Sequence, residues 1–184
     1  MRIVAGEARS RVILAPEGRD TRPTLDRVRE NLFNILQLRV RGARVLDLFA
    51  GSGALSLEAV SRGAESAVMV DKDVKAVQVM QQNVKTLRFD ERCQVLHADW
   101  TAAVRQLHSG GARFDLVFLD PPYAMRDLTA VFDALADGLL AENALVVVEH
   151  ERGKTPLIGE GFLCVDERTY GIAGIRMFRR AGEE

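Results

Sequence analysis

The chain reads Val45-Leu46-Asp47-Leu48-Phe49-Ala50-Gly51-Ser52-Gly53 over residues 45–53, a short apolar run followed by a Gly-Ser-Gly turn. Such a run, interrupted only by one aspartate, is typical of a buried parallel strand, and residues 54–60 continue with helical spacing. A strand, a glycine turn and a helix form the first half of a nucleotide-binding β-α-β unit. The glycines can adopt backbone angles closed to other residues, which lets a ligand approach the main chain. The stretch therefore predicts a nucleotide-type site at this turn.

Strand and helix patterns alternate after this stretch. We expect strands over residues 45–49, 66–70, 93–96, 114–119 and 145–149, and helices over residues 54–62, 74–87, 101–107 and 128–140. Two further apolar runs, residues 162–168 and 174–179, surround Tyr170-Gly171 and predict an antiparallel pair. The pattern predicts an α/β, doubly wound, Rossmann-like fold. Its seven-stranded sheet is mostly parallel, with an antiparallel C-terminal strand and ligands at the carboxyl ends of the parallel strands.

The residues before residue 45 follow a different pattern. Short β-type runs at residues 2–5 and 11–15 predict a β-hairpin, and residues 16–23 form a polar loop. A helix follows over residues 24–39, with Thr24 as its N-cap, an apolar face that includes Val28 and Leu32, and Arg29 on the polar face. We therefore divide the chain into an N-terminal arm, residues 1–23, and a main domain, residues 24–184.

The N-terminal part of the chain is strongly basic. Residues 1–44 carry ten arginines against five acids, although the whole chain has a net charge of −1. A basic arm on a mildly acidic domain favours a nucleic-acid phosphate backbone as partner, although surface arginines also serve solubility alone. The candidate RNA contacts are Arg2, Arg9, Arg11, Arg19 and Arg126.

Composition excludes several classes of protein. No run approaches the roughly 18 apolar residues that a membrane span needs. Cys93 and Cys164 suggest neither a disulfide framework nor a zinc site, and the three histidines share no ligand spacing, so we expect no metal. A cytoplasmic monomer with reduced thiols is expected.

Four acids stand at the ends of four successive predicted strands: Asp47, Asp71, Asp99 and Asp120. Acids at strand ends also cap the following helix, but four in a row would converge on one crevice of a doubly wound sheet. A dinucleotide is disfavoured, because Ser56 replaces the small third residue of the fingerprint and the Asp47 carboxylate would repel a pyrophosphate. The ammonium and sulfonium of S-adenosylmethionine suit this acidic end better.

This interpretation assigns roles around the turn. Asp71 is placed to accept the ribose hydroxyls, and Asp99 to accept a hydrogen bond from the adenine amino group. Trp100 either forms a wall of the adenine site or packs in the core. The predicted cofactor contacts of the main domain are Asp47, Phe49, Ala50, Gly51, Gly53, Asp71, Lys72, Asp99, Trp100 and Asp120.

Asp120-Pro121-Pro122-Tyr123 is the most specific motif. Two prolines remove two backbone donors, which leaves carbonyl oxygens and the Asp120 carboxylate as acceptors beside an aromatic ring. An exocyclic amino group on a base needs this arrangement, since acceptors for both hydrogens help to localise its lone pair on nitrogen. Tyr123 can stack on the base. These four residues are the predicted catalytic group, and the alternative is a Pro-Pro loop that only ends a strand.

Both motifs resemble those of class I S-adenosylmethionine-dependent methyltransferases that act on amino nitrogens. The segments Arg2–Gly6, Thr21–Thr24, Asp26–Glu30 and Leu32–Leu36 and the Tyr170-Gly171 ending resemble the bacterial 16S rRNA guanine-N2 methyltransferases of the RsmD family. The resemblance covers nearly the whole chain. It implies methylation of one guanine amino group in 16S rRNA, guanine 966 in the family's name, on an assembling 30S subunit. It also implies cofactor contacts from Arg22, Pro23 and Thr24.

Other functions remain open at this point. An amino methyltransferase could act on DNA adenine or cytosine, or on a protein glutamine. A non-catalytic RNA-binding module could keep the same fold, although the intact Asp120–Tyr123 motif argues against it. A nicotinamide oxidoreductase is the least favoured interpretation.

Overall fold

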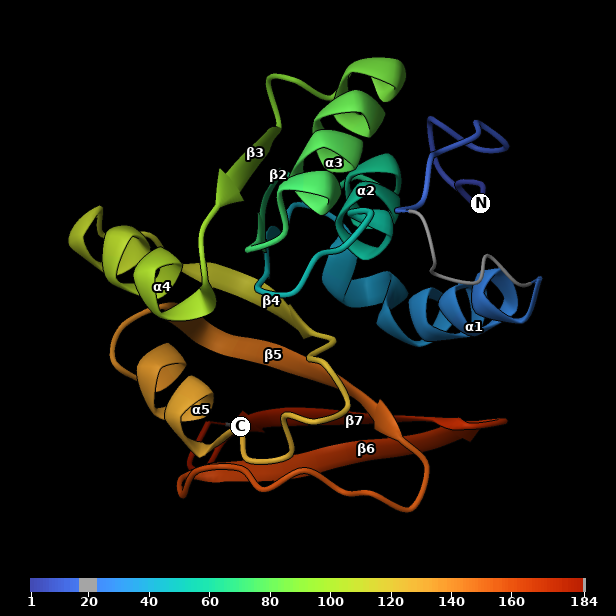
Figure 1. The fold of residues 1–184 in the computed structure, drawn as a ribbon. Coiled ribbons are helices and arrows are strands. Elements are labelled where there is room, and N and C mark those ends of the chain that lie inside the picture. The colour runs from blue at the N-terminus through green and yellow to red at the C-terminus, as the bar shows by residue number, and fades with distance from the viewer. Residues whose placement is uncertain (17–22, 184) are drawn as a thin grey trace.

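The computed structural model describes residues 1–16 and 23–183 and places helices on both faces of a seven-stranded sheet (Figure 1). The elements of the described chain are, in order, α1 (Pro23–Val40), β1 (Arg44–Asp47), α2 (Ala54–Ser61), β2 (Ser66–Asp71), α3 (Val74–Leu87), β3 (Cys93–His97), α4 (Trp100–Ser109), β4 (Phe114–Leu119), α5 (Thr129–Ala136), β5 (Leu140–Glu151), β6 (Phe162–Tyr170) and β7 (Ala173–Arg180).

The strand order across the sheet is β3-β2-β1-β4-β5-β7-β6. The first five strands pair in parallel, and β7 is antiparallel to both β5 and β6. The predicted fold class is confirmed. The order reverses between β1 and β4, so a crevice outside the carboxyl ends of these two strands is the place where doubly wound sheets bind ligands.

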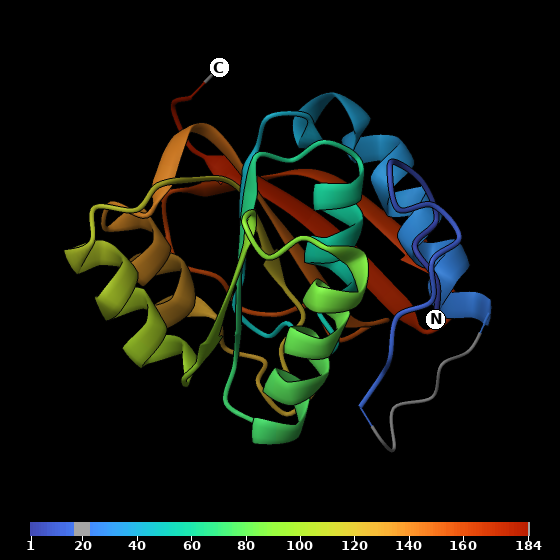
Figure 2. The same ribbon diagram turned by 90° about the horizontal axis from the view of Figure 1, so that it is seen from above.

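Two apolar cores lie on opposite faces of the sheet. Successive residues of one strand alternate between them: Val45 packs in the core under α1, α2 and α3, whereas Leu46 packs in the core under α4 and α5. Figure 2 shows the two groups of helices on either side of the sheet. The period of two explains why the strand segments are continuously apolar, since both faces are buried.

Some boundaries differ from the prediction. Thr24 lies inside α1 rather than before it, because Pro23 is already helical, and proline is well tolerated at the first position of a helix. The helix predicted over residues 128–140 ends at Ala136, and β5 begins at Leu140 rather than at residue 145. The apolar residues around Leu139 fit both the helical period of about 3.6 residues and the strand period of two. The pattern alone therefore did not show where the helix ends and the strand begins.

The described part of the N-terminal arm, residues 1–16, is an irregular hairpin. Arg2 and Val12 form an isolated antiparallel bridge, and the amides of Ile3 and Ile13 donate to the carbonyls of Arg11 and Met1 at 3.0 Å each. The predicted antiparallel pairing is present, but it does not extend into regular strands. The arm is fixed mainly by what it contacts on α2 and α3.

Candidate functional site

The carboxyl ends of β1 and β4 meet at one cavity. Asp47 is the last residue of β1, Asp120 follows β4 directly, and Asp47 is in register with Phe118 of β4. The cavity, called the acidic cavity below, is lined by Met1, Ala15, Pro16, Val28, Arg29, Leu32, Asp47, Phe49, Ala50, Ser52, Ala54, Leu55, Asp120, Glu149, Ala173 and Ile175. Its walls therefore come from the strand ends, the glycine turn, α1 and the N-terminal arm.

Asp47 is the most deeply buried acid of this cavity, with 1% of its surface exposed. Its Oδ2 accepts a hydrogen bond from the Ser56 hydroxyl at 3.3 Å, whereas its Oδ1 is buried without a hydrogen-bond partner. Burial, and secondarily the negative charge of Asp120, raise the pKa of Asp47 to about 7. The protein therefore holds a buried carboxylate that a cationic ligand would stabilise.

The glycine turn is tied to the end of β2. The Gly51 amide donates to Oδ2 of Asp71 at 2.9 Å, and the Asp73 amide donates to its Oδ1 at 2.9 Å. Gly53 has φ of +77° at the start of α2, and a Cβ atom there would lie 2.8 Å from the sulfur of Met69. The turn thus needs glycine for both its backbone angle and its close packing.

Other predicted cofactor residues do not line the acidic cavity. Asp99 caps α4, because its Oδ1 accepts hydrogen bonds from the amides of Thr101 at 2.8 Å and Ala102 at 3.0 Å. These contacts, with the Thr101 hydroxyl first among them, lower the pKa of Asp99. Trp100 packs half-buried beside the core under α4 and α5, and Lys72 is exposed. Among the predicted contacts, Asp47, Phe49, Ala50 and Asp120 line the cavity.

The loop after β4 presents its aromatic ring to solvent. Pro121 is buried, Pro122 is exposed and Tyr123 is 54% exposed. Partial burial and the charges of Glu149 and Asp120 raise the pKa of the Tyr123 hydroxyl. The loop borders a second, smaller hollow, whose rim includes the exposed Arg126.

Glu149 is a third acid at this edge that the sequence interpretation did not assign. Val148 of β5 pairs with Leu119, so Glu149 lies one residue further along the same edge as Asp120. It lines the acidic cavity. Glu149 lies at the end of an apolar strand segment, as Asp47 and Asp120 do. This shared position is the sequence signal that could have identified it.

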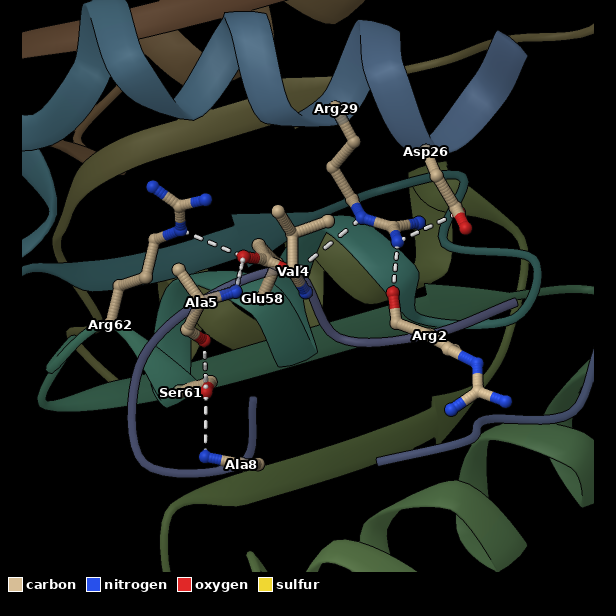
Figure 3. Close-up of polar contacts among 9 residues, drawn as sticks. All are labelled: Arg2, Val4, Ala5, Ala8, Asp26, Arg29, Glu58, Ser61 and Arg62. Carbon is tan, nitrogen blue, oxygen red and sulfur yellow. Dashed lines mark hydrogen bonds and ion pairs between the residues drawn. The ribbon is translucent and has the colours of Figure 1, made fainter. Parts of the chain in front are cut away.

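A buried glutamate fixes the N-terminal arm on α2 (Figure 3). The carboxylate of Glu58, which is fully buried, accepts hydrogen bonds from the amides of Val4 at 2.8 Å and Ala5 at 3.0 Å. It also forms ion pairs with Arg62 at 2.7 Å and with Arg29 at 3.5 Å. Arg29 is 4% exposed, so its predicted position on the polar face of α1 is wrong.

Further polar contacts hold the arm to α2 and α3. The Ser61 hydroxyl donates to the Ala5 carbonyl at 2.7 Å and accepts from the Ala8 amide at 3.0 Å (Figure 3). The side chain of Asn83 both donates to the Leu14 carbonyl and accepts from its amide. These contacts dock the described part of the arm on α2 and α3.

The predicted RNA contacts fall in different surroundings. Arg9 is exposed, whereas Arg11 donates to the carbonyls of Thr86 and Leu87 at the end of α3, and Arg2 donates to the Ser10 carbonyl at 3.2 Å. Arg19 and Arg22 lie outside the described residues. Pro23 and Thr24 begin the described part of α1.

The residues that the structure describes contain neither a metal-binding cluster nor a membrane-spanning helix. No group of three or more histidine, cysteine, aspartate or glutamate side chains there could hold a metal ion. Among the helices of residues 1–16 and 23–183, none is long and apolar enough to cross a membrane.

Comparisons with known proteins agree with the sequence motifs. A protein-family model described as conserved hypothetical protein 95 matches residues 1–179. Ribosomal RNA small subunit methyltransferase D of Escherichia coli (strain K12) is 35% identical over 185 residues, which cover all of this chain and 91% of that protein. The Haemophilus influenzae protein of the same name is 33% identical, covering 97% of this chain and 93% of its own.

A solved structure shows the same fold. A hypothetical protein of Thermus thermophilus superposes with a TM-score of 0.80 at 34% identity, covering 96% of this chain and 98% of the other. The fold, the motifs and the family match extend over nearly the whole chain. The chain therefore belongs to the family described as conserved hypothetical protein 95, which confirms its resemblance to the RsmD family.

Proposed function

We propose that this protein is an S-adenosylmethionine-dependent methyltransferase that modifies the exocyclic N2 amino group of a guanine in 16S rRNA. The target is guanine 966 by family resemblance, and the substrate is an assembling 30S subunit in the cytoplasm. The names of the Escherichia coli and Haemophilus influenzae relatives support an rRNA substrate. The observation that carries the proposal is the acidic cavity, where Asp47 and Asp120 meet at the reversal of strand order.

The residues of the cavity fit the proposed cofactor. S-adenosylmethionine carries an ammonium and a sulfonium, and the buried Oδ1 of Asp47 lacks a hydrogen-bond partner. A cation near Asp47 would offset the cost of burying its charge. When bound, S-adenosylmethionine supplies an electrophilic methyl group. The residues proposed to hold it are Arg22, Pro23, Thr24, Asp47, Phe49, Ala50, Gly51, Gly53, Asp71, Lys72, Asp99, Trp100 and Asp120.

Asp71 keeps capacity for ribose hydroxyls in this proposal. Each of its oxygens accepts one backbone amide, from Gly51 and Asp73. A carboxylate offers about four lone-pair positions, so about two remain for a ligand. The same two hydrogen bonds hold the carboxylate in place beside the turn.

The loop Asp120–Tyr123 is proposed to hold the target base. The Asp120 carboxylate and the Pro121 carbonyl accept hydrogen bonds from the guanine amino group, which orients its nitrogen and localises its lone pair. Pro122 stiffens the loop, and the exposed ring of Tyr123 stacks on the base. These residues act by positioning and by electrostatic stabilisation, without a covalent intermediate.

The basic residues of the arm are proposed to hold RNA phosphates. The proposed contacts are Arg2, Arg9, Arg11, Arg19 and Arg126. Exposure of Arg9 and Arg126 supports this role, whereas the guanidinium of Arg11 already donates a hydrogen bond to the end of α3. We propose that the protein acts as a monomer.

A methyl-transfer assay tests the proposal. Immature small subunits from cells lacking this protein are incubated with it and with methyl-labelled S-adenosylmethionine, and the modified nucleotide is mapped. Label at one guanine N2 is expected. Label in duplex DNA or in a protein glutamine instead would establish one of the other amino methyltransferase functions.

A variant separates chemistry from cofactor binding. Asp120→Ala should abolish transfer while calorimetry still detects S-adenosylmethionine binding close to that of the unaltered protein. Asp90→Ala removes an exposed acid between α3 and β3 and should leave transfer intact. If the unaltered protein binds no S-adenosylmethionine, the non-catalytic RNA-binding function is favoured.

A further inference from the structure

One side chain of α3 joins the N-terminal arm to the glycine turn. Asn83 is 1% exposed, and its side-chain amino group donates to the carbonyls of Leu14 and Ser52 at 3.0 Å each. Its Oδ1 accepts from the Leu14 amide at 2.7 Å. Both hydrogens of the carboxamide are therefore used, one on the arm and one on the turn. A buried carboxamide with these contacts cannot change its rotamer without leaving polar groups unpaired.

Two side chains from outside the turn hold its backbone. The carboxylate of Asp71 accepts from the Gly51 amide at 2.9 Å, and Asn83 donates to the carbonyl of the next residue, Ser52. Ser52 lines the acidic cavity. The position of the turn beside the cavity therefore depends on Asn83 as well as on Asp71.

The segment of the arm that Asn83 holds continues into the wall of the same cavity. Ala15 and Pro16, the two residues that follow Leu14, line the acidic cavity together with Ser52. One buried side chain therefore fixes two parts of the cavity wall that are distant in sequence. A displacement of Leu14 cannot occur without loss of the hydrogen bonds of Asn83, on which the turn also depends.

The beginning of the arm is held by α2, without Asn83 (Figure 3). Glu58 accepts from the amides of Val4 and Ala5, and the Ser61 hydroxyl accepts from the Ala8 amide. Loss of the Asn83 contacts would therefore free the end of the arm beside the cavity, while residues 4–8 stay docked on α2. The two ends of the arm are held by separate sets of contacts.

We propose that Asn83 is a positioning residue that couples RNA binding on the arm to cofactor binding at the glycine turn. The coupling rests on the proposed function, which puts RNA on the arginines of the arm and S-adenosylmethionine at the turn. RNA that holds the arm also holds Leu14 and, through Asn83, the Ser52 carbonyl. The cofactor then binds to a turn that is already ordered and loses less conformational freedom. Each ligand therefore raises the affinity of the protein for the other by the same factor.

Equilibrium dialysis of the unaltered protein tests the coupling. The probe is labelled S-adenosylhomocysteine, the demethylated form of the cofactor, which permits no methyl transfer. Its dissociation constant is measured with and without saturating immature small subunits, and subunits alone correct for binding that does not involve the protein. The subunits should lower this constant by about fivefold or more. A smaller decrease, or an increase, would overturn the coupling alone, whereas a probe that binds under neither condition would also overturn the proposed function.

A substitution then tests the role of the side chain. In Asn83→Ala the effect of the subunits should fall below about twofold, because the arm and the turn no longer share a partner. Gln81→Ala removes an exposed carboxamide from the same helix and should keep the full effect. An Asn83→Ala protein in which the effect remains above about twofold would show a structural role only and overturn the assignment of Asn83.

Amide hydrogen exchange shows whether the Asn83→Ala protein stays folded. The Leu14 amide should exchange faster, because its acceptor is lost, while the amides of Val4 and Ala5 stay protected by Glu58. If all three amides lose protection, the substitution has undocked the whole arm. That result would contradict the separate holding of its two ends, and the dialysis of the unaltered protein would still decide the coupling.

Discussion

The substitution Glu58→Gln tests how the N-terminal arm is held. The carboxylate of Glu58 accepts from two backbone amides and pairs with two arginines. A carboxamide has one oxygen and one amino group in place of two oxygens. Its amino group would face either the Val4 amide and Arg29, or the Ala5 amide and Arg62. In both orientations, donors oppose donors, and both arginines lose the negative charge beside them.

The expected loss follows from burial. Removing one partner of a buried ion pair costs about 3–5 kcal/mol, since it leaves an uncompensated charge. Glu58 has no exposed surface, so solvent cannot replace the lost contacts. In a domain of this size, each kcal/mol lowers the melting temperature by about 2–4 °C, so a fall of about 6–20 °C is expected.

Urea denaturation and amide hydrogen exchange measure the effect. The free energy of unfolding should fall by the stated amount, and the amides of Val4 and Ala5 should exchange faster. Glu30→Gln, which removes the same charge from the exposed surface of α1, should stay within about 0.5 kcal/mol of the unaltered protein. A Glu58→Gln protein with unaltered stability and unaltered exchange at both amides would refute the reasoning.

Three further substitutions test the turn, the buried acid and the aromatic ring. Gly53→Ala should lower the free energy of unfolding by about 1–3 kcal/mol more than Gly42→Ala, in urea denaturation. Both positions have positive φ, but only the first Cβ would meet Met69, so equal losses would exclude the close contact as a cause. The folded-state pKa of Asp47 is raised to about 7, so stability should fall as pH rises from about 4 to 7, by up to about 4 kcal/mol. Asp47→Asn should remove that slope, and parallel pH profiles of the two proteins would contradict it. Tyr123→Ala should reduce kcat/KM for RNA methylation by about 10- to 100-fold while Tyr123→Phe stays close to the unaltered protein, and equal loss in both would exclude stacking.

The framework of the fold could be predicted because its signals are local. The alternation of apolar strands and helices placed α3 and β4 at their observed bounds, and the acids at strand ends indicated the edge where Asp47 and Asp120 meet. Buried parallel strands are apolar on both faces, which makes them distinct from their polar connections.

The docking of the arm could not be predicted, because it depends on pairs distant in sequence. Glu58 and its amide partners are separated by 53 and 54 residues. Helical periodicity predicted that Arg29 lies on the polar face of α1. The periodicity of one helix carries no information about a buried acid on another helix. The available signal was that Glu58 is the only charged residue in the otherwise uncharged helix Ala54–Ser61. A lone charge in such a helix indicates a buried partner.

The contacts of the arm also bear on the order of folding during synthesis. The described hydrogen-bond and ion-pair partners of residues 1–14 all lie before Cys93, at Arg29, Glu58, Ser61, Asn83, Thr86, Leu87 and Arg92 or within the arm itself. All of these polar partners are therefore synthesised before β4. Two of the cavity-lining residues, Ala173 and Ile175, belong to β7. The polar partners of the N-terminal arm are thus synthesised well before the β7 residues that complete the cavity.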